Sequence, residues 1–149
     1  VEAFFVTDCP APDFLDLKRF FPPTLIRVLI DKDGVDFDEK FSKDLLDTKL
    51  IQGDRTLIER ASKLPKDLIK GLLKKAEVIA KEKSELIVEK QRLNLVSSMD
   101  NEVSRLEALS QVNPNISQDE VELMRAMKKV MLDHTQGVRL RLEAVRVIL

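Results

Sequence analysis

The spacing of apolar residues along the chain changes several times, and each spacing predicts a different element. Residues 1–7 (VEAFFVT) are apolar and rich in β-branched and aromatic side chains, which is typical of a strand. Residues 24–31 (TLIRVLID) predict a second strand, and residues 32–34 (KDG) predict a turn with a glycine that can adopt a positive φ. Apolar and charged residues alternate at the start of residues 138–149, which therefore predict a closing strand. Its wholly apolar end suggests a central place in the sheet.

Helical spacing dominates the middle of the chain. Residues 37–46 place Phe and Leu side chains on one face of a short amphipathic helix, and Asp54 suits the N-cap of the next helix. From residue 65 to residue 112, apolar residues recur at steps of three, four and seven, which predicts one helix of about 70 Å at about 1.5 Å per residue. Such a helix exceeds the width of a domain of this size, so we expect it to project or to break. Residues 94–100 (NLVSSMD) are its weakest part.

A helical hairpin is predicted around residues 113–115 (NPN), which stop the long helix. Ser117 and Glu120 have the spacing of a capping box and start the next helix, for which Gly137 fits the C-cap. A connection this short predicts that the two helices are antiparallel neighbours.

These elements predict an α+β fold. We expect a small, mainly antiparallel sheet with strands near both chain ends, packed by a long antiparallel helical hairpin. Residues 1–149 are interpreted as one domain, in which residues 1–53 are rich in strands and turns, residues 54–137 are helical and residues 138–149 form the closing strand.

Charge and composition narrow the class of protein. The 149 residues carry a net charge of −1, so no global field favours nucleic acid. No run approaches the ~18–20 apolar residues of a membrane helix, and no signal peptide is evident, so we expect no membrane contact and a cytoplasmic location. The single cysteine suits that reducing compartment. Both ends are apolar, which leads us to expect a fragment of a larger protein.

No pattern in the sequence predicts catalysis. His134 has no nucleophile partner identifiable by spacing, and Cys9 lies in no reactive motif, so we interpret both as structural. Nucleotide-binding, zinc-protease and serine-hydrolase motifs do not occur. We therefore expect no catalytic residue and no bound cofactor in this chain.

Acidic residues crowd the segment 31–39 (DKDGVDFDE), which invites comparison with a calcium loop. Its glycine falls fourth rather than sixth, and no glutamate closes the loop at the twelfth position. We therefore favour a solvated hairpin turn over a metal site.

Two further features could bind a partner. Lys63, Lys66, Lys70 and Lys74 recur at steps of three and four, which predicts a lysine stripe along one helical face. Such a stripe can meet phosphates or an acidic protein surface, although lysine is also common on an ordinary solvated face. The chain has no Tyr or Trp for base stacking, so nucleic-acid binding through the stripe would be weak.

The second feature is the apolar seam of residues 68–109, which leaves a coiled-coil oligomerisation module open as an alternative. Lys83 and Lys90 interrupt this seam at heptad spacing, which favours packing within a larger protein.

Two blocks of the sequence resemble a known family. The first is residues 9–31 (CPAPDFLDLKRFFPPTLIRVLID), and the second is residues 105–120 (RLEALSQVNPNISQDE) together with residues 139–149 (RLRLEAVRVIL). In order and spacing they are similar to the C-terminal domain of the bacterial RNA polymerase-associated RapA (HepA) family of Swi2/Snf2-type ATPases. VNPNI is the most distinctive motif. The blocks cover about a third of the chain, and the helical middle matches only in character.

The resemblance implies a parent protein that binds RNA polymerase and helps stalled polymerase to recycle. Such a parent is helicase-like, binds DNA, and uses ATP and Mg in lobes outside this chain. For the chain itself, the resemblance implies a non-catalytic accessory domain that regulates transcription by interaction. Its implied partners are RNA polymerase and the other domains of the parent ATPase, with nucleic acid as a weak further partner.

Overall fold

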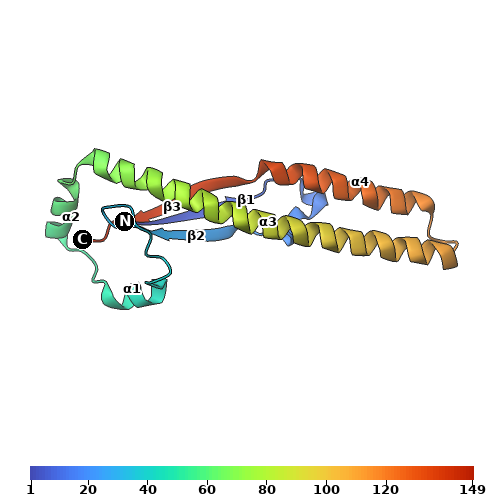
Figure 1. The fold of residues 1–149 in the computed structure, drawn as a ribbon, viewed down its shortest axis with the longest axis horizontal. Coiled ribbons are helices and arrows are strands. Elements are labelled where there is room, and N and C mark those ends of the chain that lie inside the picture. The colour runs from blue at the N-terminus through green and yellow to red at the C-terminus, as the bar shows by residue number, and fades with distance from the viewer. The chain divides into compact units, whose positions relative to one another are not determined.

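A computed structural model describes all 149 residues and contains one sheet and four α-helices (Figure 1). The strands are β1 (Glu2–Asp8), β2 (Thr24–Leu29) and β3 (Arg139–Arg146), in the order β2-β1-β3. The helices are α1 (Lys43–Lys49), α2 (Arg55–Ser62), α3 (Lys66–Val112) and α4 (Gln118–His134). Short 3-10 turns cover Asp13–Leu15, Leu17–Arg19 and Thr135–Gly137. The predicted α+β class, with an antiparallel sheet built from both chain ends, is confirmed.

The chain divides into two compact units. Unit 1 holds Val1–Val6, Leu25–Ser84 and Leu140–Leu149, and unit 2 holds Thr7–Thr24 and Glu85–Arg139. Helix α3 contributes its first part to unit 1 and its second part to unit 2.

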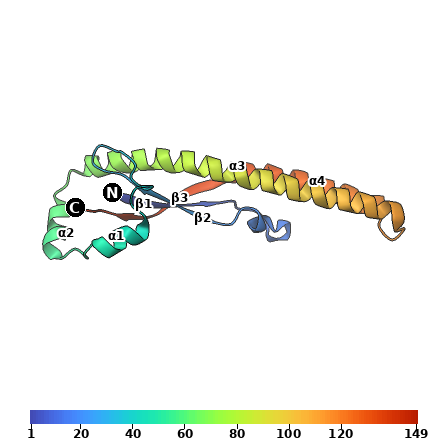
Figure 2. The same cartoon turned by 60° about the horizontal axis from the view of Figure 1, so that its bottom comes forward.

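In unit 1 the first part of α3 lies along one face of the sheet (Figures 1 and 2). The period of two along β1 buries Ala3 and Phe5. Helix α3 buries Leu72, Ala76 and Ala80, which recur at steps of four. Burial of these side chains, together with Ile26, Val28 and Ile30, supplies the main driving force for folding unit 1.

Strand β3 lies at the edge of the sheet, so the expectation of a central place for it is wrong. Strand β1 is central instead. The strand ends at Arg146, and the apolar residues Val147, Ile148 and Leu149 lie beyond the ladder. They therefore add nothing to the burial of β3, where Leu142 is 47% exposed.

The short helix predicted from residue 37 begins later than expected. Helix α1 starts at Lys43, where the Ser42 hydroxyl accepts the N–H of Leu45 at 3.3 Å. Phe37 instead opens a turn, and its carbonyl accepts the N–H of Phe41 at 3.0 Å. The prediction of a helix at Phe37 was wrong because the acidic residues around it are held in turns and ion pairs.

Helices α3 and α4 lie side by side as an antiparallel hairpin in unit 2 (Figures 1 and 2). Ser117 caps α4 as predicted, because its hydroxyl accepts the N–H of Glu120 at 3.3 Å. Gly137 is not the C-cap. Thr135 ends the helix in right-handed conformation, and its hydroxyl donates to the carbonyl of Leu132 at 2.7 Å and accepts Arg92 Nε at 3.0 Å.

Helix α3 continues without a break through residues 94–100. Leu95 and Met99 in this segment are buried in a cluster with Cys9, Leu17 and other apolar residues of unit 2. Burial of the two side chains outweighs the weak helix propensity of the Ser and Asn residues around them.

Leu95→Ala is expected to destabilise unit 2 by about 2–5 kcal/mol, because Leu95 is fully buried and its loss leaves a cavity. Leu93→Ala, two residues away on the same helix, is the matched control, since Leu93 is 63% exposed. It should change stability by less than about 0.5 kcal/mol. Urea unfolding monitored by circular dichroism measures both, and equal effects would contradict the burial of Leu95.

Candidate interaction surface

A buried carboxylate ties the three strands of unit 1 together. Glu2 on β1 is fully buried, and Arg27 Nε on β2 donates to its Oε1 at 2.6 Å. Arg146 Nε on β3 donates to its second oxygen, Oε2. A central acid thus holds one guanidinium from each flanking strand, a charge-assisted arrangement stronger than neutral hydrogen bonds.

The two arginines also pair with acidic residues outside the sheet. Arg27 Nη1 donates to Asp38 Oδ1 at 2.7 Å, and Arg146 Nη1 donates to Asp47 Oδ1 on α1 at 2.6 Å. Lys83 on α3 lies 3.0 Å from carboxylate oxygens of Asp36 and of Asp38. Together with Glu2, these residues form what we call the charged network. It joins the strands, the acidic loop, α1 and α3.

The acidic segment 31–39 therefore has two parts. Its first part is the predicted turn, with Gly34 at φ 85° and the Asp31 carboxylate accepting the N–H groups of Asp33 and Val35 at 2.9 Å. Its second part is not simply solvated, since Asp36 and Asp38 are paired with Lys83. The interpretation as a solvated turn was wrong for these two residues. Lys83, which interrupts the apolar seam, supplies the positive charge that pairs with both carboxylates.

The ionised forms of Asp36, Asp47 and Lys83 in the charged network are favoured by their partners. Burial raises the pKa of Asp36, but the N–H of Asp38 and the Lys83 ammonium outweigh it, so the pKa lies below its ordinary value. Burial lowers the pKa of Lys83, yet its hydrogen bonds to Asp36 and Asp38 leave it raised. The hydrogen bond from Arg146 lowers the pKa of Asp47 despite some desolvation.

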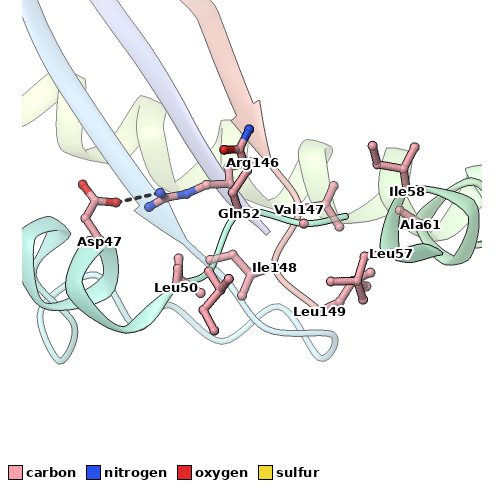
Figure 3. Close-up of a pocket in the computed structure, with 12 residues that line it drawn as sticks. Asp47, Leu50, Gln52, Leu57, Ile58, Ala61, Arg146, Val147, Ile148 and Leu149 are labelled. Atoms are coloured by element: carbon pink, nitrogen blue, oxygen red, sulfur yellow. Dashed lines mark hydrogen bonds and ion pairs between the residues drawn. The ribbon is translucent and has the colours of Figure 1, made fainter. Parts of the chain in front are cut away.

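A groove opens where the charged network reaches α1 (Figure 3). Asp47 and Arg146 line it as an ion pair, and most of the remaining lining is aliphatic. We call this the α1–α2 groove, and its lining is Asp47, Leu50, Ile51, Gln52, Gly53, Leu57, Ile58, Ala61, Arg146, Val147, Ile148 and Leu149. Its volume is about 460 Å³. The chain alone leaves it open, since Ile51 is 93% and Ile58 65% exposed.

The predicted lysine stripe is interrupted by the connection between α2 and α3. Lys63 caps the C-terminus of α2, whereas Lys66 is the first residue of α3, so the two do not share a helix. Lys66, Lys70 and Lys74 follow at steps of four along α3 and share a face. All four are exposed. Their role as a contact for a partner or nucleic acid stays a prediction.

Cys9 and His134 lie together in unit 2. Cys9 is buried, and its Sγ donates to the carbonyl oxygen of His134 at 3.4 Å. Burial, with a further effect of Asp8, raises the pKa of the Cys9 thiol, so it is not activated as a thiolate. Cys9 therefore has a structural contact, as the sequence suggested, whereas His134 takes part through its backbone carbonyl and the role of its imidazole stays a prediction.

A second cavity, of about 460 Å³ in unit 2, was not foreseen from the sequence. All four methionines of the chain line it, namely Met99, Met124, Met127 and Met131. Phe14 lies at this cavity and is 74% exposed, and Asp16 beside it has a positive φ of 46°. Met99 comes from α3 and the other three from α4, so only the packing of the hairpin brings them together.

The apolar seam of residues 68–109 does not form one continuous face. Leu72 and Met99 are buried, whereas Leu86 is 75% and Leu93 63% exposed. Residues at seven-residue spacing drift by about 20° per heptad around a straight helix, so a long seam turns away from its starting face. The oligomerisation alternative therefore depends on the exposed pair Leu86 and Leu93.

Comparison with known proteins places the chain in a family. Residues 1–149 match the RNA polymerase recycling family C-terminal domain, to which this chain belongs. The chain is 30% identical over 147 residues to RNA polymerase-associated protein RapA of Yersinia enterocolitica. It is 30% identical over 148 residues to RapA of Serratia proteamaculans and 28% over 147 residues to RapA of Yersinia pestis. Each match covers 99% of this chain but only 15% of the relative.

This result confirms the resemblance drawn from the VNPNI region and its companion blocks. The chain spans about 15% of the length of the curated relatives it matches. The helices, including the long α3, lack the sustained apolar stretch that a membrane-spanning helix needs.

Glu2→Gln is expected to lower the free energy of unfolding by about 3 kcal/mol, because two partly buried guanidinium groups lose their shared counter-charge. Arg27 and Arg146 each already have one buried Nη2 without a hydrogen-bond partner, so neither has spare pairing to offset the loss. Glu143→Gln on β3 is the control, since Glu143 is 44% exposed and pairs with Arg141 alone at 3.1 Å. It should cost less than about 1 kcal/mol in urea unfolding.

Lys83→Met is expected to flatten the pH dependence of stability at both extremes. The lowered pKa of Asp36 contributes stability above the ordinary value of 3.8, and this is lost as pH falls through the lowered pKa. The raised pKa of Lys83 contributes stability below 10.5, which is lost as pH rises through the raised pKa. Urea unfolding midpoints are measured at acid and at alkaline pH. They should depend less on pH in Lys83→Met than in Lys129→Met, the control at an exposed lysine. Identical curves for Lys83→Met and Lys129→Met would contradict the pairing.

Proposed function

We propose that this chain is a non-catalytic interaction domain of a RapA-like, ATP-dependent protein that acts in transcription regulation and polymerase recycling. The observation that carries this proposal is the family match over all 149 residues. The relatives are named for their association with RNA polymerase, and the chain corresponds to 15% of their length. By resemblance, ATP and Mg belong to the other domains of a cytoplasmic parent protein.

The side chains of this domain support a role in binding. The ionisable residues of the charged network pair with one another across strands and helices, so they are used to hold the fold together. The α1–α2 groove is mainly apolar, and the methionine-lined cavity combines its methionines with charged side chains such as Arg19 and Glu102. Large exposed apolar areas with polar surroundings mark sites for partners.

Oligomerisation through α3 is a second candidate, favoured by the exposed pair Leu86 and Leu93 at heptad spacing. Sedimentation of the chain over a range of concentrations tests it. A monomer at all concentrations removes this candidate.

The isolated chain is expected to retain core RNA polymerase in a pull-down and to hydrolyse no ATP above background. Removing residues 1–149 from the longer protein should weaken its binding to polymerase at least about ten-fold, equivalent to about 1.4 kcal/mol. Surface plasmon resonance and a phosphate-release assay measure the two quantities. ATP hydrolysis by the isolated chain, or unchanged polymerase binding after the deletion, would refute the proposal. The control is the chain carrying Glu143→Gln, which should bind like the wild type.

A further inference from the structure

The α1–α2 groove presents apolar side chains while its own charges are already paired. Eight of its twelve lining residues are aliphatic, from Leu50 on one side to Leu149 on the other. Asp47 and Arg146 bind each other, and Arg146 also binds Glu2, so the lining carries no unpaired acid or base that reaches out for a ligand. The groove is therefore suited to apolar side chains of a partner (Figure 3).

Helix α2, one wall of the groove, is poorly supported by its own chain. None of its eight residues is buried. Leu57, Ile58 and Ala61 lie on the side that lines the groove, and Ile58 is 65% exposed. A helix of two turns is marginal in water by itself, so a ligand that covers this face would also order the helix.

The segment that builds this wall is strongly basic. Residues 49–75 contain eight Lys or Arg residues and three Asp or Glu residues, a net charge of +5, whereas the whole chain has −1. Lys63, Lys66, Lys70 and Lys74 in this segment are all exposed. Its field attracts an acidic partner and increases the rate of encounter.

A nucleic acid is also acidic, but the groove does not match its chemistry. No aromatic residue lines the groove, and stacking on aromatic side chains is the usual source of affinity for unpaired bases. Aliphatic walls beside a basic segment match a polypeptide in which acidic and apolar residues are mixed.

We propose that the α1–α2 groove and the basic segment of residues 49–75 bind an acidic segment of RNA polymerase that inserts apolar side chains. This proposal rests on the proposed function, and it names the surface and the kind of partner. The apolar side chains lie against Leu57, Ile58 and Ala61, and the acidic residues face the lysines. Binding orders α2.

The test compares variants of the whole chain in binding to core RNA polymerase. Ile58→Glu places a charge in the groove, and the double change Lys66→Glu with Lys70→Glu reverses the charge of the basic segment. Each should weaken binding at least about ten-fold, and binding of the wild type should fall with salt more steeply than binding of the double variant. Amide exchange of residues 55–62 should slow on binding.

The matched controls are Leu123→Glu and Lys129→Glu on α4. Leu123 is 69% exposed, similar to Ile58, and neither control lines the groove. Both should change binding by less than about two-fold. Thermal unfolding of every variant checks that it folds, which is expected because the altered side chains are exposed.

Several outcomes separate this inference from the proposed function. Polymerase binding that is unchanged by Ile58→Glu overturns the groove and leaves the proposed function standing. If the wild-type chain does not bind polymerase, the proposed function falls.

In that case the groove is tested with a short synthetic peptide in which Glu and Leu alternate, and with a matching peptide in which Lys replaces each Glu. Tighter binding of the acidic peptide that is lost in Ile58→Glu supports the groove, whereas absence of binding overturns it. Tighter binding of single-stranded DNA than of the acidic peptide also overturns it, in favour of a nucleic-acid surface.

Discussion

The buried carboxylate of Glu2 is the constraint on which unit 1 depends. An isolated charge in a protein interior is very unfavourable, so Glu2 requires both Arg27 and Arg146 in place at once. These partners lie on the two outer strands, one near the start of the chain and the other near its end. The charged network therefore specifies the strand order β2-β1-β3 in a way that apolar burial alone would not, because apolar contacts carry little directional information.

The same constraint determines the candidate interaction surface. Arg146 uses one nitrogen for Glu2 and another for Asp47, which holds α1 beside the end of β3. The groove is the space between α1, α2 and the residues that follow β3. The charged network thus positions an apolar surface, and the residues that hold the groove in place are different from those proposed to contact the partner.

The predicted elements and their order were largely right wherever local chemistry is decisive. Asp54 and Ser117 cap helices because a side-chain oxygen can satisfy free N–H groups two or three residues ahead, whatever the rest of the chain does. The errors lie where distant residues compete with local preference. Phe37 has helical spacing, but ion pairs and turns in its acidic surroundings delay α1 to Lys43. The separation of Lys63 and Lys66 into different helices has a local cause instead, because Pro65 lies between them and disfavours a continuous helix.

Periodicity, caps and turn residues were enough to define the α+β class, the long hairpin and the two terminal strands, because each depends on neighbours within a few residues. Two blocks of sequence, residues 9–31 and residues 105–120 with 139–149, were enough to indicate the family. Only the tertiary structure decided that Lys83 neutralises Asp36 and Asp38, that Arg146 meets Glu2, and that an open groove lies beside α2. The partners in these ion pairs are 45 to 144 residues apart along the chain. No local sequence pattern encodes which of such distant charges will meet.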